Sequence, residues 1–274
     1  MNTRLRSTLL AVPALLALAA PATAFAHSQW LLPSETTFSG EEAWVSIDAA
    51  VSSELFISNF HSLDPQNFTA TGPDGQSVPI ENAVKGQVRS MFEVHLTKPG
   101  TYRIGSTNTG VFGGYTLNGE KKRLPRGVTA DKIASLIPQG ATDVQLRENQ
   151  STNQVFVTLG VPDNAVFKPT GKGLEMVPVT HPDDLVANEP GVFTFLVDGQ
   201  PAAGLKVSVT KDDRWAATPI KQDVTTDAKG QAKVTWSGPG MYWMEARASD
   251  NKVSIPGATD RGLSYVATLE VQAP

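Results

Sequence analysis

Residues 90–106 read Ser90-Met91-Phe92-Glu93-Val94-His95-Leu96-Thr97-Lys98-Pro99-Gly100-Thr101-Tyr102-Arg103-Ile104-Gly105-Ser106. Phe92, Val94 and Leu96 alternate with polar residues, which is the period of a strand with one buried face. The Pro-Gly pair that follows marks a turn, and a second apolar run begins directly after it. The stretch therefore predicts a β-hairpin and favours an all-β fold.

Similar short apolar runs recur along the chain, with turn residues between them. Residues 43–51 alternate as a half-buried strand does, and residues 72–75 read Gly-Pro-Asp-Gly, a clear turn signal. Helix signals are scarce. A short helix is expected only at residues 129–137, where Thr129 can serve as the N-cap and Pro138 ends the pattern. The first half of the chain thus predicts an antiparallel sandwich.

The second half echoes the hairpin of the first. Residues 238–242, Gly-Pro-Gly-Met-Tyr, repeat the Pro-Gly-x-Tyr pattern of residues 98–102. Strands at residues 232–236 and 242–246 are expected to pair across this turn. The echo supports two related units, and we expect two immunoglobulin-like or prealbumin-like β-sandwich domains.

The expected domain boundaries follow changes in composition. Residues 27–162 form the predicted N-terminal domain and residues 174–274 the C-terminal domain, with the Pro- and Gly-containing segment 163–173 as the linker. Within residues 108–128, Gly110, Gly113, Gly114 and Gly119 are followed by three consecutive basic residues. We expect a long mobile loop there, either a plain surface loop or a binding lid.

The first 26 residues have the pattern of a cleavable signal peptide. Arg4 and Arg6 precede an apolar core at residues 9–20, and Ala24-Phe25-Ala26 fits the small-x-small cleavage rule. The apolar core is short for a membrane span. We expect a periplasmic or secreted protein that has no membrane insertion after processing, and no cysteine is available for lipid anchoring.

Composition argues against several classes of function. Cleavage after Ala26 leaves 21 Lys and Arg against 27 Asp and Glu, a formal charge of −6, which argues against nucleic-acid partners. The chain has no cysteine and so no disulfide. It has neither a Gly-x-Ser-x-Gly elbow nor a Gly-x-Gly-x-x-Gly turn that opens a helix. We therefore expect no enzyme activity.

The four histidines are the candidate metal ligands. After cleavage His27 carries both a free α-amino group and an imidazole, which can chelate one ion within a single residue. His61 ends a predicted strand, and His181 precedes Pro182 beside two aspartates. His95 lies on a predicted solvent face. We expect His27, His61 and His181 to bind a divalent transition metal. Counting strands, however, places His61 at the opposite end of the sandwich from His27, and His95 at the same end.

The sequence resembles a bacterial periplasmic family called domain of unknown function 4198. The segments that carry the resemblance are spread along nearly all of the predicted mature chain: residues 27–31, 60–62, 72–75, 98–102, 168–175, 178–182 and 238–243. Some members of the family accompany nickel and cobalt uptake systems. The resemblance implies a periplasmic accessory to metal uptake, with nickel, cobalt or iron as the metal and an envelope transport component as a partner. The lack of a histidine-rich stretch argues against bulk metal storage.

A looser similarity links the N-terminal histidine to periplasmic copper carriers and copper oxygenases, which also place such a histidine on a sandwich. Imidazole and amine ligands suit copper. Three hypotheses follow: a metal-binding accessory to uptake, a non-catalytic interaction or structural module of the envelope, and a copper-binding N-terminal-histidine protein. The metal, whether nickel, cobalt, iron or copper, is left open.

Overall fold

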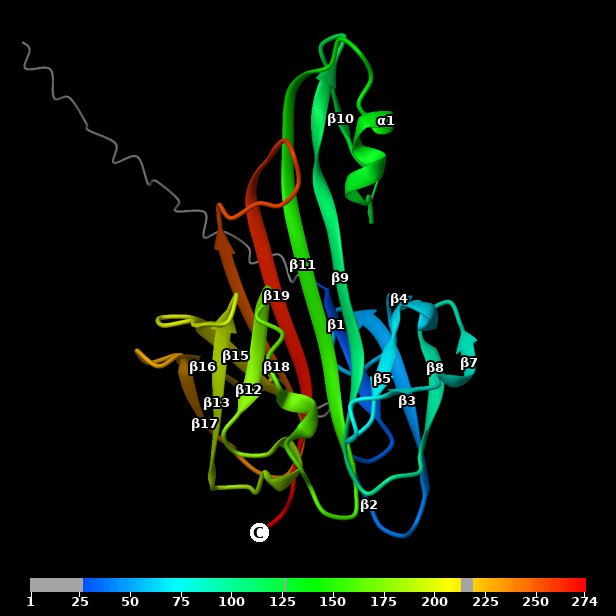
Figure 1. Ribbon diagram of the computed structural model, residues 1–274, viewed down its shortest axis with the longest axis vertical. Coiled ribbons are helices and arrows are strands. Elements are labelled where there is room, and N and C mark those ends of the chain that lie inside the picture. The colour runs from blue at the N-terminus through cyan, green and yellow to red at the C-terminus, as the bar shows by residue number, and fades with distance from the viewer. Residues whose placement is uncertain (1–26, 126, 213–218) are drawn as a thin grey trace, which may run out of the picture.

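A computed structural model describes residues 27–125, 127–212 and 219–274, and the predicted signal peptide lies outside them (Figure 1). As predicted, the fold is all-β. The described residues form three sheets. A five-stranded sheet contains β1 (Ser28–Pro33), β3 (Ala43–Ser52), β4 (His61–Ser62), β7 (Glu81–Lys85) and β8 (Ser90–Leu96).

A central ten-stranded sheet runs through the whole molecule, and a four-stranded sheet lies against part of it. The central sheet contains β2 (Thr37–Phe38), β5 (Thr69–Thr71), β6 (Ser77–Val78), β9 (Gly100–Leu117), β10 (Glu120–Arg123), β11 (Thr142–Leu159), β15 (Lys206–Lys211), β16 (Lys221–Thr225), β18 (Gly240–Asp250) and β19 (Ala258–Val271). The four-stranded sheet contains β12 (Leu174–Pro178), β13 (Pro190–Val197), β14 (Gln200–Pro201) and β17 (Gln231–Thr235).

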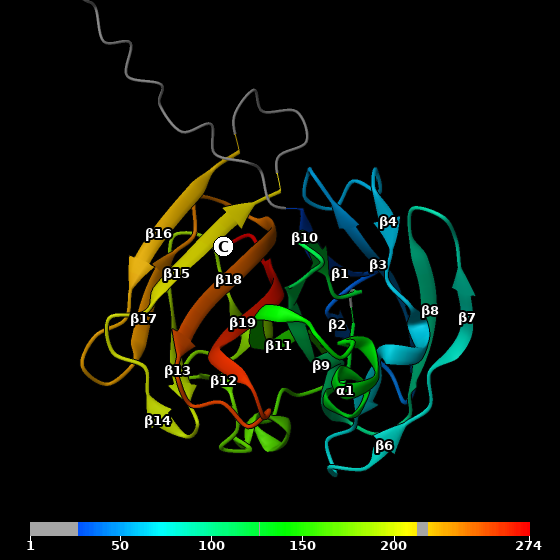
Figure 2. The ribbon, with the colours of Figure 1, turned by 90° about the horizontal axis from the view of Figure 1, so that it is seen from above.

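The two outer sheets cover opposite faces of the central sheet, because successive side chains of a strand point to opposite sides. Along β11, Val155 and Val157 enter the core beneath the five-stranded sheet, whereas Phe156 enters the core beneath the four-stranded sheet. Figure 2 shows the outer sheets on the two sides of the central strands. The fold is thus a pair of sandwiches that share one sheet.

Both predicted hairpins are wrong in their pairing, although their strands are confirmed. β8 pairs with β3 and β7, whereas β9 pairs with β5, β10 and β11. Likewise β17 pairs with β13, and β18 pairs with β15 and β19. Each Pro-Gly turn therefore carries the chain from an outer sheet to the central sheet. A turn signal marks the end of a strand but does not say which strand the next one pairs with.

The tyrosines of the two Pro-Gly-x-Tyr turns form hydrogen bonds that hold the chain where it passes from one sheet to the other. Tyr102 Oη donates to the carbonyl oxygen of Lys98 at 2.9 Å and accepts from the Lys98 N–H at 2.8 Å. Tyr242 Oη donates to the carbonyl oxygen of Gly238 at 2.8 Å, the same four-residue step back. Both are buried, and both follow a glycine at positive φ. This is the tyrosine corner known from Greek-key sandwiches.

Residues 108–128 are not the predicted mobile loop. β9 continues to Leu117, turns into β10, and pairs with β11 over most of its length. The resulting hairpin projects from the sandwiches (Figure 1) and has a small core of its own, which the helical segment covers. That core contains Val111, Leu124, Val128, Ile133, Leu146 and Ile255.

The predicted short helix is confirmed as η2 (Ala130–Lys132) and α1 (Ile133–Leu136). Three further 3₁₀ turns are η1 (Pro65–Asn67), η3 (Ala165–Phe167) and η4 (Pro182–Asp184). None of the helices in the described part of the chain is long and apolar enough to cross a membrane.

The segment 163–173, predicted as the linker, is packed against the protein. Its residues Val166 and Phe167 are buried in the core beneath the four-stranded sheet. β11 lies before this segment and β19 after it, and the two pair in parallel within the central sheet. The division into domains at 27–162 and 174–274 stays a prediction.

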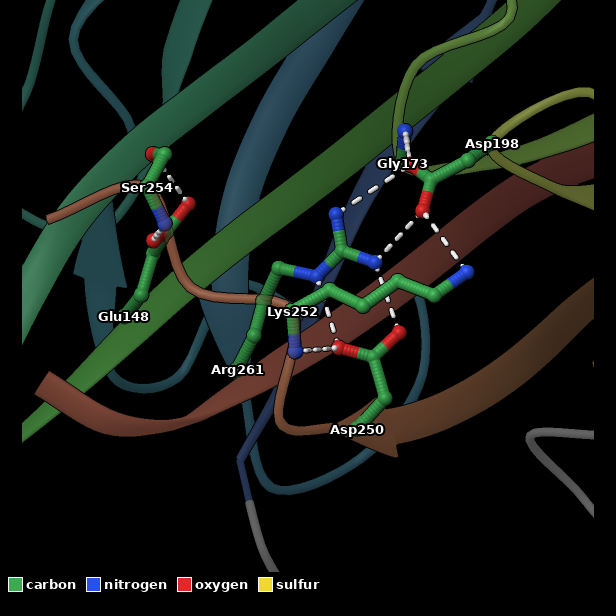
Figure 3. Close-up of polar contacts among 7 residues, drawn as sticks. All are labelled: Glu148, Gly173, Asp198, Asp250, Lys252, Ser254 and Arg261. Carbon is green, nitrogen blue, oxygen red and sulfur yellow. Dashed lines mark hydrogen bonds and ion pairs between the residues drawn. The ribbon is translucent and has the colours of Figure 1, made fainter.

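A buried arginine of β19 joins the end of β18 to the turn between β13 and β14 (Figure 3). Arg261 lies between Asp198 and Asp250 and binds both carboxylates with hydrogen bonds of 2.6–3.1 Å. Its side chain is 10% exposed. Nearby, the carboxylate of Glu148 accepts from the N–H and hydroxyl of Ser254. The Arg261 contacts thus tie the start of β19 to β18 and to the four-stranded sheet, and the Glu148 contacts tie the loop before β19 to β11.

Candidate functional site

His27 and His61 lie at the same corner of the five-stranded sheet. β1 and β4 flank β3, with Ser28 opposite Ser52 and His61 opposite Val51. The strand count that separated the two histidines was therefore wrong. It treated residues 55–60 as a strand, but residues 53–60 turn back in irregular structure at the end of β3.

The aromatic ring of Phe60 links the two imidazoles. The His27 ring stacks on Phe60 with centroids 3.8 Å apart, and the Phe60 and His61 rings are 4.9 Å apart. Phe60 is 46% exposed. This arrangement, the His27–Phe60–His61 corner, places two imidazoles beside an apolar ring at the surface.

A backbone contact selects the tautomer of the neutral His61 ring. Its Nδ1 lies 3.0 Å from the carbonyl oxygen of Ser62. Because a carbonyl oxygen only accepts, Nδ1 carries a proton, and in the neutral ring Nε2 keeps its lone pair. The same hydrogen bond orients histidines that bind metals through the opposite nitrogen. His61 is thus arranged to offer Nε2 as a ligand.

Two imidazoles alone do not complete a metal site at the corner. Within the described ranges no group of three or more His, Asp or Glu side chains is placed to hold a metal ion. A third ligand at the corner would have to be the α-amino group of His27, which the predicted cleavage would create. The imidazole and amine of that residue then form one chelate ring.

His181 is far from this corner and both of its nitrogens are engaged. Nδ1 accepts from the N–H of Asp183 at 3.1 Å, and Nε2 lies 3.0 Å from Thr101 Oγ1 and 3.1 Å from the carbonyl oxygen of Asp163. Burial lowers the pKa of His181 below its ordinary value. The ring is neutral, with the proton on Nε2, and it caps η4.

The distance between His181 and the His27–Phe60–His61 corner follows from the position along β11 that each one contacts. Gln29, two residues after His27, donates to Ser151 of β11, whereas His181 contacts Thr101, which pairs with Thr158 of β11. Seven residues of extended strand span roughly 23 Å. The structure thus brings His27 and His61 together and leaves His181 at the other end of β11.

A directed chain of hydrogen bonds runs from His181 to a buried carboxyl group. Thr101 Oγ1 and Thr158 Oγ1 are 2.9 Å apart, and Thr158 Oγ1 donates to Asp183 Oδ2 at 2.5 Å. Burial raises the pKa of Asp183 to about 7, against the hydrogen bond from Thr158, which lowers it. The sequence pointed to His181 here, whereas the unusual titrating group is Asp183.

The hydrogen bonds of this threonine–histidine–aspartate chain do not run in the direction that a hydrolytic triad requires. In a triad the imidazole Nε2 accepts the hydroxyl proton, and Nδ1–H donates to the carboxylate. Here Nε2 carries the proton and Nδ1 accepts from a backbone N–H. His181 therefore acts as a buried structural group in this arrangement.

His95 lies at the opposite end of β3 from His61, in correction of the strand count that placed it with His27. It pairs with Trp44 across the strands, and the two rings stack at 4.3 Å. Its Nε2 lies 3.1 Å from Glu42 Oε2 at the surface. The predicted solvent-facing position of His95 is confirmed.

Comparison with known proteins identifies a family. A family model described as "Domain of unknown function (DUF4198)" matches residues 24–250. A search of curated proteins found no match.

The similar solved structures include the D0-D1 domain of Intimin, at 13% identity and a TM-score of 0.22, which covers 88% of this chain and 96% of that one. The D00-D0 domain of Intimin, at 10% identity and a TM-score of 0.21, covers 89% of this chain and 100% of that one. A marsupial T cell receptor, at 10% identity and a TM-score of 0.21, covers 90% and 72%. Scores this low support no argument about function.

Proposed function

The chain belongs to the family of domain of unknown function 4198, and on this premise we propose that it is an exported accessory protein that binds one divalent transition-metal ion at the His27–Phe60–His61 corner. The observation that carries the proposal is the meeting of His27 and His61 around one aromatic ring, where His61 Nε2 has no hydrogen-bond partner among the described residues. Cleavage after Ala26 supplies the α-amino group as the third ligand.

The chemistry of this ligand set favours particular metals. Three nitrogen ligands, two imidazoles and one amine, suit copper and nickel better than iron, and copper forms the most stable complexes of the divalent series. We therefore rank copper and nickel ahead of cobalt and iron. The Phe60 ring, stacked on His27, would hold that imidazole in place for the ion.

In the proposed role the protein binds its metal in the periplasm and passes it to an envelope transport component. An open site at the edge of a sheet suits transfer, because a partner can supply further ligands without unfolding the protein. The rival hypothesis is an interaction module that docks through its sheet edges and binds no metal.

The test compares two forms of the protein that differ in one residue. The first begins at His27 and the second retains Ala26, which converts the α-amine into an amide and removes a ligand. By titration calorimetry with Cu²⁺ or Ni²⁺, the form that begins at His27 should bind at least tenfold more tightly, about 1.4 kcal/mol or more. Binding should weaken as the pH falls, because protons compete with the metal for the nitrogen ligands.

Histidine variants test the ligand set. In the form that begins at His27, His61→Gln should also weaken binding at least tenfold. His95→Gln is the matched control and should leave the affinity unchanged, because that ring stacks on Trp44 at the other end of the strand. Equal affinities for both N-terminal forms would refute the site and favour the interaction module.

A further inference from the structure

A groove of about 660 Å³ lies on the central sheet, on the face that the four-stranded sheet only partly covers. Its floor consists of β9 and β11, and one wall is the segment that leads into β12. The residues that line it are Asn67, Thr69, Arg103, Gly105, Ser106, Thr107, Thr109, Gln150, Thr152, Gln154, Thr170, Lys172, Leu174 and Glu175. The volume is in the range of small-molecule sites.

The floor of the groove is polar where the same face is apolar elsewhere. Along β11 this face carries Phe156 in the core and then Gln154, Thr152 and Gln150 in the groove. Thr152 is 5% exposed, although threonine usually lies at the surface. A sheet face that only had to exclude water would continue the apolar series, so this polar strip requires another explanation.

The groove also holds two cationic side chains without a carboxylate partner. Among the described residues Arg103 forms no ion pair, and its hydrogen bond runs from Nη1 to the carbonyl oxygen of Val166 at 3.1 Å. The remaining N–H groups of this half-buried guanidinium are available. Lys172, in the wall, likewise forms no ion pair in the described parts of the chain.

The one acidic residue of the groove is already engaged. Glu175 accepts from the N–H and hydroxyl of Thr170 at 2.7 and 2.8 Å and from the N–H of Gly171 at 2.8 Å. These bonds hold the wall in shape. Glu175 therefore forms no ion pair with either cation among the described residues.

A fixed amide adds a neutral donor. Tyr265 Oη donates to Gln154 Oε1 at 3.1 Å, which leaves the Gln154 amide N–H groups free for a ligand. The threonine hydroxyls of the floor can both donate and accept. The set of donors therefore matches a ligand that carries one carboxylate and several hydroxyl groups.

We propose that this groove binds a small polyhydroxylated carboxylate, with Arg103 and Lys172 on the carboxylate and the amides and hydroxyls of the floor on the ligand hydroxyls. Arg103 is the specificity residue, because its planar guanidinium can bind a carboxylate with two parallel hydrogen bonds. The groove lies on the opposite face of the sheet from the five-stranded sheet that holds His27, so this activity is independent of metal binding.

The test uses two sugars that differ only in the group on one carbon, which is charged in the first and neutral in the second. Galacturonate has a carboxylate where galactose has a hydroxymethyl group, so titration calorimetry at low salt isolates the carboxylate contribution. Galacturonate should bind at least tenfold more tightly than galactose, and added NaCl should reduce this preference. Equal binding of both sugars, or binding of neither, would overturn the proposal.

Two variants locate the site. Arg103→Gln should weaken galacturonate binding at least tenfold and leave galactose binding unchanged. Lys172→Gln, in the exposed wall, should weaken galacturonate binding about threefold. This variant keeps the test decisive if loss of the hydrogen bond to Val166 destabilises Arg103→Gln. Arg89→Gln is the matched control, since Arg89 pairs with Asp48 on the five-stranded sheet.

The expected result for Arg89→Gln is wild-type affinity. An equal loss in Arg89→Gln and Arg103→Gln would show a nonspecific effect of net charge and would overturn the assignment. His61→Gln should bind galacturonate as wild type does, which separates failure of the groove from failure of the metal site.

Discussion

Replacement of Asp183 by asparagine should change how the stability of the protein depends on pH. Asp183 is 5% exposed, and its burial raises the pKa to about 7 from 3.8. A carboxyl group that binds its proton more tightly in the folded state contributes stability below pH 3.8, and that contribution is lost as the pH rises to about 7. Asparagine stays neutral and can still accept the hydrogen bond from Thr158.

The size of the contribution of Asp183 to the free energy of unfolding follows from the shift in its pKa. A shift of about three pKa units corresponds to about 4 kcal/mol over the whole titration. Between pH 5 and pH 8 the wild type should lose roughly 2–3 kcal/mol through Asp183. The lowered pKa of His181 acts in the opposite direction, because its contribution is lost as the pH falls below about 6.5. Both proteins retain His181, so the difference between them isolates Asp183.

The assay is urea unfolding of wild type and Asp183→Asn at four pH values from 5 to 8. The variant should gain stability relative to wild type as the pH rises, by roughly 2–3 kcal/mol across this range. Asp143→Asn is the matched control, because its side chain is exposed at the other end of β11, and its pH dependence should follow wild type. Parallel curves for wild type and Asp183→Asn would show that the buried carboxyl is ionised at little cost and would refute the reasoning.

Two further predictions concern stability, both measured by denaturant unfolding. Tyr102→Phe should cost about 1–3 kcal/mol, because the backbone groups of Thr97 and Lys98 lose their partner, whereas Tyr115→Phe should cost almost nothing. Equal costs would argue against the tyrosine corner. Arg261→Gln should cost about 2–4 kcal/mol by leaving two carboxylates together, and the exposed Arg247→Gln less than about 1 kcal/mol. A negligible cost at Arg261 would mean that the loop after β18 is held by other contacts.

The sequence predicted strands well because alternation is a local property. The pattern of Phe92, Val94 and Leu96 is buried as predicted, and the motif shared by Tyr102 and Tyr242 has the same geometry in both places. Pairing was mispredicted because a hairpin and a crossing between sheets both require a turn at the same position.

The sites were harder to predict for the same reason. The meeting of His27 and His61 depends on whether residues 53–60 form a strand, and the apolar residues there gave the wrong answer. The raised pKa of Asp183 arises from burial against β11, and the groove joins Arg103 to Lys172 from segments about 70 residues apart. No local pattern in the chain records such contacts.

The shared central sheet has a consequence for the order of folding. The partners of β11 on β19 lie more than 110 residues further along the chain, so this parallel pairing has a high contact order and forms late. β19 serves both sides of the sheet: Leu263 and Tyr265 face one core, and Val266 faces Trp30 on the other. Synthesis must therefore reach the last strand before either half is complete, and a chain that ends before residue 258 leaves both halves open.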